Sequence, residues 1–198
     1  IVPYENIKSI SDIAKKNDIK LHIDGARVWH AILVEDKGYD YGTYTDSLTF
    51  CFSKALGAPI GSILLGSHEF IENSREYRKK LGGGMRQAGV IASAARYAIE
   101  NREHILIDHK NTKYIYEKLK EREEELNLID TISYKNTNMV FLSFEDMTVS
   151  SNFIKKLENQ NIRSGFIRKN IVRLVIHKDI KQEDLDKIVA AIIHSSSA

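Results

Sequence analysis

The sequence predicts an α/β protein: the C-terminal part of a large domain with a mostly parallel sheet, followed by a small α+β domain. Residues 6–17 repeat apolar side chains along one helix face, and a short apolar strand follows at 19–23. A second apolar strand follows at 48–52. Helices and strands in this order are typical of a parallel sheet. From about residue 126 the pattern changes to short strands with helices between them, which indicates a different second domain.

The other elements follow from local signals. The glycine-bounded apolar run at 61–66 predicts the next strand, and Ser67 is placed to cap a helix over 68–80, which Gly82-Gly-Gly84 then ends. We expect further helices over 85–101, 103–124, 149–160 and 181–194, and strands over 126–134, 139–144, 162–166 and 171–176. The domains are therefore expected to span 1–102 and 103–198.

Composition excludes several classes of function. The chain has 198 residues, 42% hydrophobic and 28% charged, with a net charge of +2, so its charge does not favour nucleic acid or a membrane as partner. No apolar run approaches the roughly 20 residues of a membrane span. The single cysteine, Cys51, fits a reducing compartment, and we expect a cytoplasmic protein in which Cys51 is a buried small hydrophobe. The start at Ile1 reads as a strand end and a loop, which suggests one piece of a longer or split protein.

Two charged residues stand where apolar strands end. Asp24 follows Leu21-His-Ile23, and Lys54 follows Leu48-Thr-Phe-Cys-Phe52. Pyridoxal phosphate requires both types at once, a lysine for a Schiff base and an acid against its ring nitrogen. The alternatives are a turn aspartate and a surface loop lysine. Neither His22 nor Asp24 has a third ligand at metal spacing, so no metal site is expected.

Arginines and glycines supply candidate anion sites. Arg27 lies three residues after Asp24, where a simple ion pair is the alternative. The run Gly82-Gly-Gly-Met-Arg86-Gln-Ala-Gly89 leads into a helix and suits a phosphate, although a flexible turn between domains would look the same. Arg173 lies inside an apolar strand, where its charge needs an anionic partner such as a substrate carboxylate. The alternatives are a structural salt bridge, or an edge strand on which the arginine faces solvent.

Together these segments resemble the low-specificity L-threonine aldolases, which belong to the aspartate aminotransferase-like, fold-type I enzymes that use pyridoxal phosphate. The matching stretches occur in the family's order: Pro3-Tyr-Glu-Asn-Ile7, Leu21-His-Ile-Asp-Gly-Ala-Arg27, Ser53-Lys-Ala-Leu-Gly-Ala-Pro-Ile-Gly-Ser62, Arg78-Lys-Lys-Leu-Gly-Gly-Gly-Met-Arg-Gln-Ala-Gly89 and Val172-Arg-Leu-Val-Ile-His177. The glycine run ending in Met-Arg-Gln-Ala-Gly is the most discriminating of these.

The resemblance implies a function in amino acid metabolism. The chain would be a carbon–carbon lyase that cleaves L-threonine or L-allo-threonine, a β-hydroxy amino acid, to glycine and acetaldehyde. Lys54 would bind pyridoxal phosphate as a Schiff base, and Asp24 would keep the pyridine nitrogen protonated. Arg27 would lie by the cofactor and the substrate carboxylate, and Arg173 by that carboxylate.

The resemblance also implies partners. Lys79 and Arg86 would reach a cofactor phosphate, either of this chain or of a neighbouring subunit in a dimer or tetramer. The family's N-terminal portion supplies a phosphate-binding Gly-Thr pair and the histidine that stacks on the ring. The match begins after that portion, so the resemblance implies that this chain needs it, for example as a second polypeptide. The alternatives are another fold-type I enzyme (a β-eliminating lyase or an aminotransferase) or an inactive structural fragment.

Overall fold

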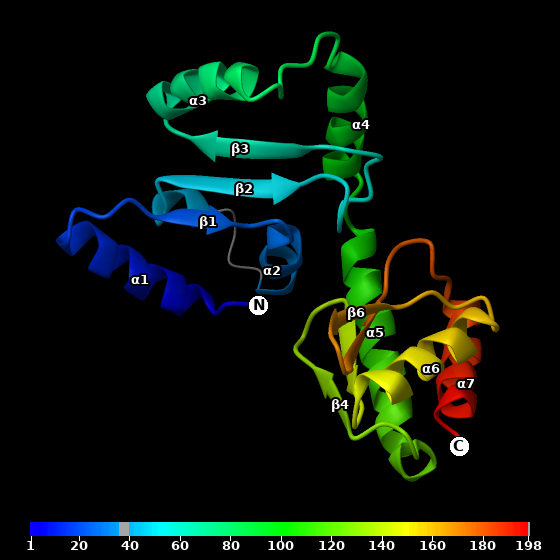
Figure 1. Ribbon diagram of the computed structural model, residues 1–198. Helices are drawn as coiled ribbons and strands as arrows, with labels where there is room; N and C mark the ends of the chain where they lie inside the picture. Colours follow the sequence, from blue (N-terminus) through cyan, green and yellow to red (C-terminus); the bar gives the residue numbers. More distant parts are fainter. Residues whose placement is uncertain (36–39, 198) are drawn as a thin grey trace. The chain divides into compact units, whose positions relative to one another are not determined.

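A computed structural model describes residues 1–35 and 40–197. The chain forms two compact units, Ile1–Glu103 and His104–Ala198 (Figure 1). Each unit is described by itself. The first contains α1 (Tyr4–Lys16), β1 (His22–Asp24), α2 (Val28–Glu35), the 3-10 turn η1 (Asp40–Thr43), β2 (Ser47–Cys51), β3 (Ser62–Gly66), α3 (His68–Lys80) and α4 (Gly89–Glu100).

The first unit contains a three-stranded sheet in the order β1-β2-β3 (Figure 1). β1 runs parallel to β2, with Asp24 opposite Thr49, and β3 runs antiparallel to β2, with Leu65 opposite Leu48. Opposed residues share a face, so Ile23, Leu48 and Leu65 lie on one side of the sheet, whereas Asp24 and Thr49 lie on the other. The fold class α/β is confirmed, and this part of the sheet is mixed.

Helix α2 was not predicted. Its sequence, Val28-Trp-His-Ala-Ile-Leu-Val-Glu35, has only one charged residue, at its end, so it lacks the polar stripe by which a surface helix is recognised. Its first three residues are buried, and the Trp29 ring meets Phe50 of β2 edge-to-face at 5.8 Å. Tertiary packing, rather than amphipathic periodicity, accounts for this helix.

Helix α3 begins and ends where the sequence predicted. The Ser67 hydroxyl accepts a hydrogen bond from the Phe70 backbone N–H at 3.2 Å, which satisfies one of the free donors at the helix start. Gly82 follows the helix with φ +79°, a conformation that glycine adopts at little cost. Cys51, expected to be buried, is only half-buried.

The second unit packs helices against a four-stranded antiparallel sheet in the order β4-β5-β7-β6. Its elements are α5 (His104–Glu121), η2 (Glu123–Glu125), β4 (Thr131–Tyr134), β5 (Met139–Ser143), α6 (Met147–Glu158), β6 (Gly165–Arg168), β7 (Ile171–Val175), η3 (Gln182–Asp184) and α7 (Leu185–Ser196). Its core includes the fully buried Leu142, Phe144, Phe153 and Ile192, so this unit has a hydrophobic centre of its own.

Candidate functional site

Asp24 and Lys54 follow neighbouring parallel strands at the same end of the sheet. Asp24 is the last residue of β1, and Lys54 lies in the turn that begins after β2 ends at Cys51. The Gly25 backbone N–H donates to the Thr49 carbonyl at 2.8 Å, which fixes the two strand ends against each other. In α/β sheets this carboxyl end is the usual place for a ligand.

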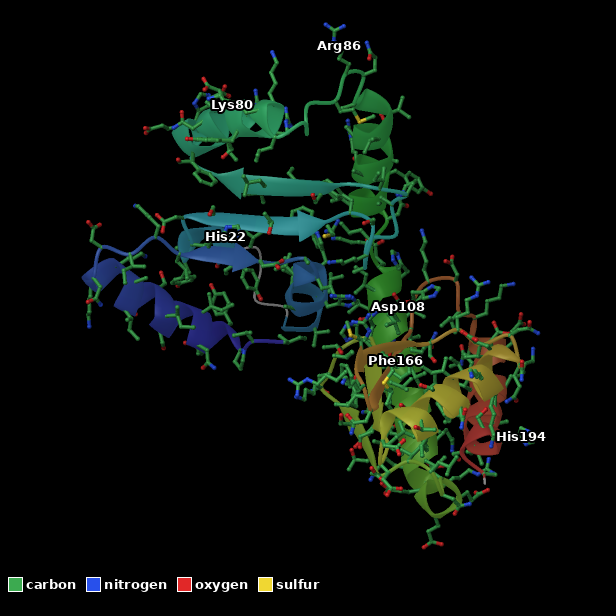
Figure 2. All side chains as sticks on the ribbon, viewed as in Figure 1. His22, Lys80, Arg86, Asp108, Phe166 and His194 are labelled. Atoms are coloured by element: carbon green, nitrogen blue, oxygen red, sulfur yellow. The ribbon has the colours of Figure 1, made fainter. Side chains whose placement is uncertain are left out.

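The Asp24 carboxylate is held at the turn that leaves β1. Its Oδ1 accepts a hydrogen bond from the Ala26 backbone N–H at 3.1 Å, and the residue is exposed. On the same face, two residues earlier, His22 Nδ1 lies 2.8 Å from the Ser47 hydroxyl (Figure 2). The carboxylate is therefore oriented by its own backbone and presents a second oxygen to a ligand.

Lys54 stands on a tightly bonded loop between β2 and β3. The Phe52 N–H donates to the Gly61 carbonyl at 2.9 Å, and the Gly57 N–H donates to the Lys54 carbonyl at 2.9 Å. Gly61 has φ +119°, and a Cβ there would lie 3.3 Å from the Phe52 ring, so the loop requires glycine at this position. Lys54 is exposed, and no ion pair or side-chain hydrogen bond holds its amine within residues 1–35 and 40–197.

Arg27 stands between β1 and α2. It is half-buried, and its carbonyl accepts a hydrogen bond from the His30 N–H at 3.1 Å. The turn of Asp24 and Gly25 thus places Arg27 three residues from the acid, at the start of a helix packed on the sheet.

Lys79 and Arg86 belong to α3 and the loop after it, not to the ends of β1 and β2. Lys79 is in the last turn of α3, and Arg86 projects from the loop between α3 and α4 (Figure 2). Both are exposed, and among the described residues neither forms a hydrogen bond or ion pair with Asp24 or Lys54. The described contacts therefore do not connect Lys79 or Arg86 to the residues at the strand ends.

Arg173 belongs to the second unit, in the middle of β7, with Phe141 of β5 on one side and Gly165 of β6 on the other. Its Nε is buried and has no hydrogen-bond partner among the described residues. A buried guanidinium N–H without an acceptor costs free energy, so this arginine is suited to an external anion.

Sequence reasoning missed Asp108 of α5, which is only 3% exposed. Burial raises the pKa of this carboxyl to about 6, against the opposing effect of His104 and His177, which lower it. The sequence signal was an acid directly after Ile105-Leu-Ile107.

Two classes of site receive no support from the part of the chain that the structure describes. None of its helices combines the length and apolar character needed to cross a membrane. Over the same residues, no three His, Cys, Asp or Glu side chains gather as metal ligands would.

Comparison with known proteins places the chain in a family. The model of the family described as beta-eliminating lyase matches residues 1–145. The chain belongs to the beta-eliminating lyase family. This family member resembles "Low-specificity L-threonine aldolase 1" of Arabidopsis thaliana, with 38% identity over 185 residues, which cover 91% of the chain and 51% of the relative. It is also 33% identical to the "Low specificity L-threonine aldolase" of Escherichia coli strain K12, over 96% of the chain and 55% of the relative.

The fold is shared with solved structures. An ornithine aminotransferase from Toxoplasma gondii, whose active site holds PLP at partial occupancy, aligns with a TM-score of 0.67 at 16% identity, over 93% of this chain and 44% of that one. The predicted resemblance to L-threonine aldolases with the fold of pyridoxal-phosphate enzymes is therefore confirmed. The beta-eliminating lyase family member described here spans about half the length of the relatives that it matches.

Proposed function

We propose that this chain carries the lysine-bearing half of a pyridoxal-phosphate-dependent aldolase that cleaves L-threonine or L-allo-threonine to glycine and acetaldehyde. One observation carries the proposal: Asp24 and Lys54 follow adjacent parallel strands at one end of the sheet, and Lys54 has an exposed amine that no described residue engages. The names of the relatives favour the aldolase over an aminotransferase.

The residues present fit the cofactor. An unpaired amine at Lys54 is available to bond an aldehyde carbon, and the second oxygen of Asp24 is available to accept a hydrogen bond from a protonated ring nitrogen. Pyridoxal phosphate, when bound, withdraws electrons from the substrate carbon that is losing a bond. Asp24 supports this by keeping a proton on the ring nitrogen, because an adjacent carboxylate favours the charged form of the ring.

Arg173 is proposed to hold the substrate carboxylate, assisted by Arg27. The unsatisfied Nε of Arg173 gains an acceptor when a carboxylate binds, and a guanidinium can bind both carboxylate oxygens. Orientation by this grip would set which bond of the substrate lies ready to break.

Lys79 and Arg86 are proposed to bind the cofactor phosphate of a neighbouring copy in a dimer or tetramer. Their exposure, and the lack of any hydrogen bond or ion pair to Asp24 or Lys54 among the described residues, support a role outside their own strand-end site. Two cations at a helix end and a glycine loop suit a phosphate dianion.

We also propose that the site is completed by the part of the family's chain that this polypeptide does not match. The relatives are about twice as long as the aligned segment, and the resemblance assigns the ring-stacking histidine to the other part. This chain alone is then expected to bind the cofactor weakly and to turn over threonine slowly.

The test is a pyridoxal phosphate titration of the chain mixed with a polypeptide that carries the unmatched residues of the E. coli relative. We expect a visible absorption band that borohydride fixes on Lys54, as mapped by peptide mass spectrometry, and that is absent in Lys54→Ala. Lys8→Ala, which removes an exposed lysine of α1, is the matched control and should keep the band. Acetaldehyde and glycine as products support the aldolase, whereas ammonia with a keto acid indicates a β-eliminating lyase. No band under any of these conditions would favour an inactive fragment.

A further inference from the structure

We propose that Asp46 and Ser47, at the start of β2, are positioning residues for Asp24. They hold the short strand β1 in its observed register against β2, and the register decides on which face of the sheet the acid lies. We call the contacts that they make with Leu21 and His22 the register clamp. The inference rests on the proposed function, because it concerns how the acid of that site is placed.

Strand β1 has little apolar burial to fix its register. It is three residues long, and among residues 1–35 and 40–197 its only strand partner is β2. His22 and Asp24 are exposed, and Ile23 between them is only half-buried. A register is strongly specified where one face of a strand is buried and weakly specified where it is not. Polar contacts are therefore needed to hold β1 in place.

The register matters for Asp24 because a shift of one residue turns every side chain of a strand to the other face. In the observed register Asp24 lies opposite Thr49, whereas Ile23 lies opposite Leu48 on the other side of the sheet. A shift of one residue would move the carboxylate to the side of Leu48 and put an apolar side chain in its place. The acid of the proposed site thus depends on the contacts that fix the pairing of β1 with β2.

The register clamp joins the start of β1 to the start of β2. The Asp46 carboxylate accepts a hydrogen bond from the Leu21 N–H at 2.9 Å, and the Asp46 N–H donates to the Leu21 carbonyl at 2.9 Å. One pair further along, His22 Nδ1 lies 2.8 Å from the hydroxyl of the buried Ser47 (Figure 2). These side-chain contacts link residues 25 positions apart in the sequence, so they fix the two strands against each other.

The bond from the Leu21 N–H, rather than an ion pair, is the main part of the clamp. Lys20 Nζ lies 3.1 Å from Asp46 Oδ1, but these side chains are 82% and 45% exposed, and exposed ion pairs contribute little. The Leu21 N–H is the largest cause that lowers the pKa of the Asp46 carboxyl, and the hydrogen bond from Lys20 adds to it. The carboxylate is therefore ionised at neutral pH and available as an acceptor for the strand.

Strand β2 connects the clamp to the lysine of the proposed site. It runs from Ser47 to Cys51, and Lys54 lies in the turn that follows. Beyond Asp24, the Gly25 N–H donates to the carbonyl of Thr49 in the same strand at 2.8 Å. β1 is thus tied to β2 both before and after the acid, which sets the acid relative to the strand that leads to the lysine.

The test compares variants of the full chain, mixed with the polypeptide that carries the unmatched residues of the E. coli relative. The cofactor is pyridoxal phosphate with an isotope label on its ring nitrogen, whose NMR shift reports whether that nitrogen is protonated. Asp46→Ala should move the shift toward the unprotonated value and weaken cofactor binding at least about fivefold. Asp46→Asn should change the affinity less than about twofold, because its amide oxygen still accepts from the Leu21 N–H.

Asp146→Ala is the matched control. The Asp146 carboxylate also accepts hydrogen bonds from backbone N–H groups, those of Thr148 and Val149 at the start of α6 in the second unit. This variant should lose stability but leave the shift of the ring nitrogen unchanged, since it does not touch β1. An unchanged shift in Asp46→Ala, an equal change in Asp146→Ala, or a loss in Asp46→Asn as large as in Asp46→Ala would each overturn the proposal.

Hydrogen exchange without the cofactor tests the clamp independently of the proposed function. In the chain alone, Asp46→Ala should speed exchange of the Gly25 amide at least about fivefold, because that amide is protected by its bond to Thr49. Ser47→Ala removes only the His22 contact and should speed it about twofold, which provides a milder variant if Asp46→Ala does not fold. Unchanged exchange at Gly25 would overturn the proposal. Accelerated exchange without any lysine band in the unchanged chain would instead refute the proposed function alone.

Discussion

Replacement of Arg173 by methionine is expected to stabilise the chain and to remove the proposed interaction with the substrate carboxylate. The buried Nε has no acceptor among the described residues, and a buried polar group left unsatisfied costs about 1–3 kcal/mol. Methionine keeps an unbranched aliphatic stem of similar length and brings no unpaired donor. Because Arg173 is only half-buried, we expect the lower end of this range, about 1 kcal/mol of added stability.

For a chain of this size a gain of about 1 kcal/mol raises Tm by roughly 2–4 °C. Calorimetry and urea unfolding measure the change. Arg96→Met is the matched control, because the Arg96 Nε is exposed and bonded to Glu100 Oε1 at 2.8 Å. Loss of that surface pair should change stability by less than about 0.5 kcal/mol.

In the assembled enzyme, Arg173→Met should raise KM for threonine while the absorption of the lysine-bound cofactor stays unchanged. A loss of more than about 1 kcal/mol of stability in Arg173→Met would refute the reasoning, since it would show that the guanidinium makes a structural contact inside the fold. An unchanged KM would refute its assignment to the substrate carboxylate.

The remaining predictions concern stability. The raised pKa of Asp108 means that the folded chain binds a proton more tightly than the unfolded chain between about pH 4 and pH 6, so stability should fall as pH rises through this window. Asp108→Asn should flatten that slope and stabilise the chain above pH 6. The gain should be at most about 3 kcal/mol and, with solvent screening, about 1–2 kcal/mol. Urea unfolding at several pH values measures it, and an unchanged slope would contradict the assignment to Asp108. Ser67→Ala should cost about 1 kcal/mol by removing the cap of α3, whereas Ser74→Ala, whose hydroxyl only bonds back to the Phe70 carbonyl in the same helix, should cost much less. Similar losses in both serine variants would show that the cap is not the cause.

Local interactions explain why several helices and strands of this fold could be predicted from the sequence. Ser67 predicts the start of α3 because a short hydroxyl side chain bonds the free N–H groups there. The strands β2 (Ser47–Cys51) and β7 (Ile171–Val175) contain apolar runs bounded by turn residues, and each overlaps the strand expected there, at 48–52 and 171–176. Helix α2 was not predicted because its sequence lacks the polar stripe of a surface helix, and the burial of its first turn, Val28-Trp-His30, comes from tertiary packing.

For the candidate site, too, some features follow from the sequence and others only from the tertiary structure. The sequence alone determined which side chains carry reactive groups, because an acid and a lysine directly after apolar strands are conspicuous at any position in a fold. Only the tertiary structure decided that β1 and β2 are parallel neighbours, which brings Asp24 and the loop of Lys54 to one end of the sheet. The same applies to the buried Nε of Arg173, which has no hydrogen-bond partner among the described residues. Strand pairing and burial arise from contacts between residues far apart in the chain, and no local pattern encodes them.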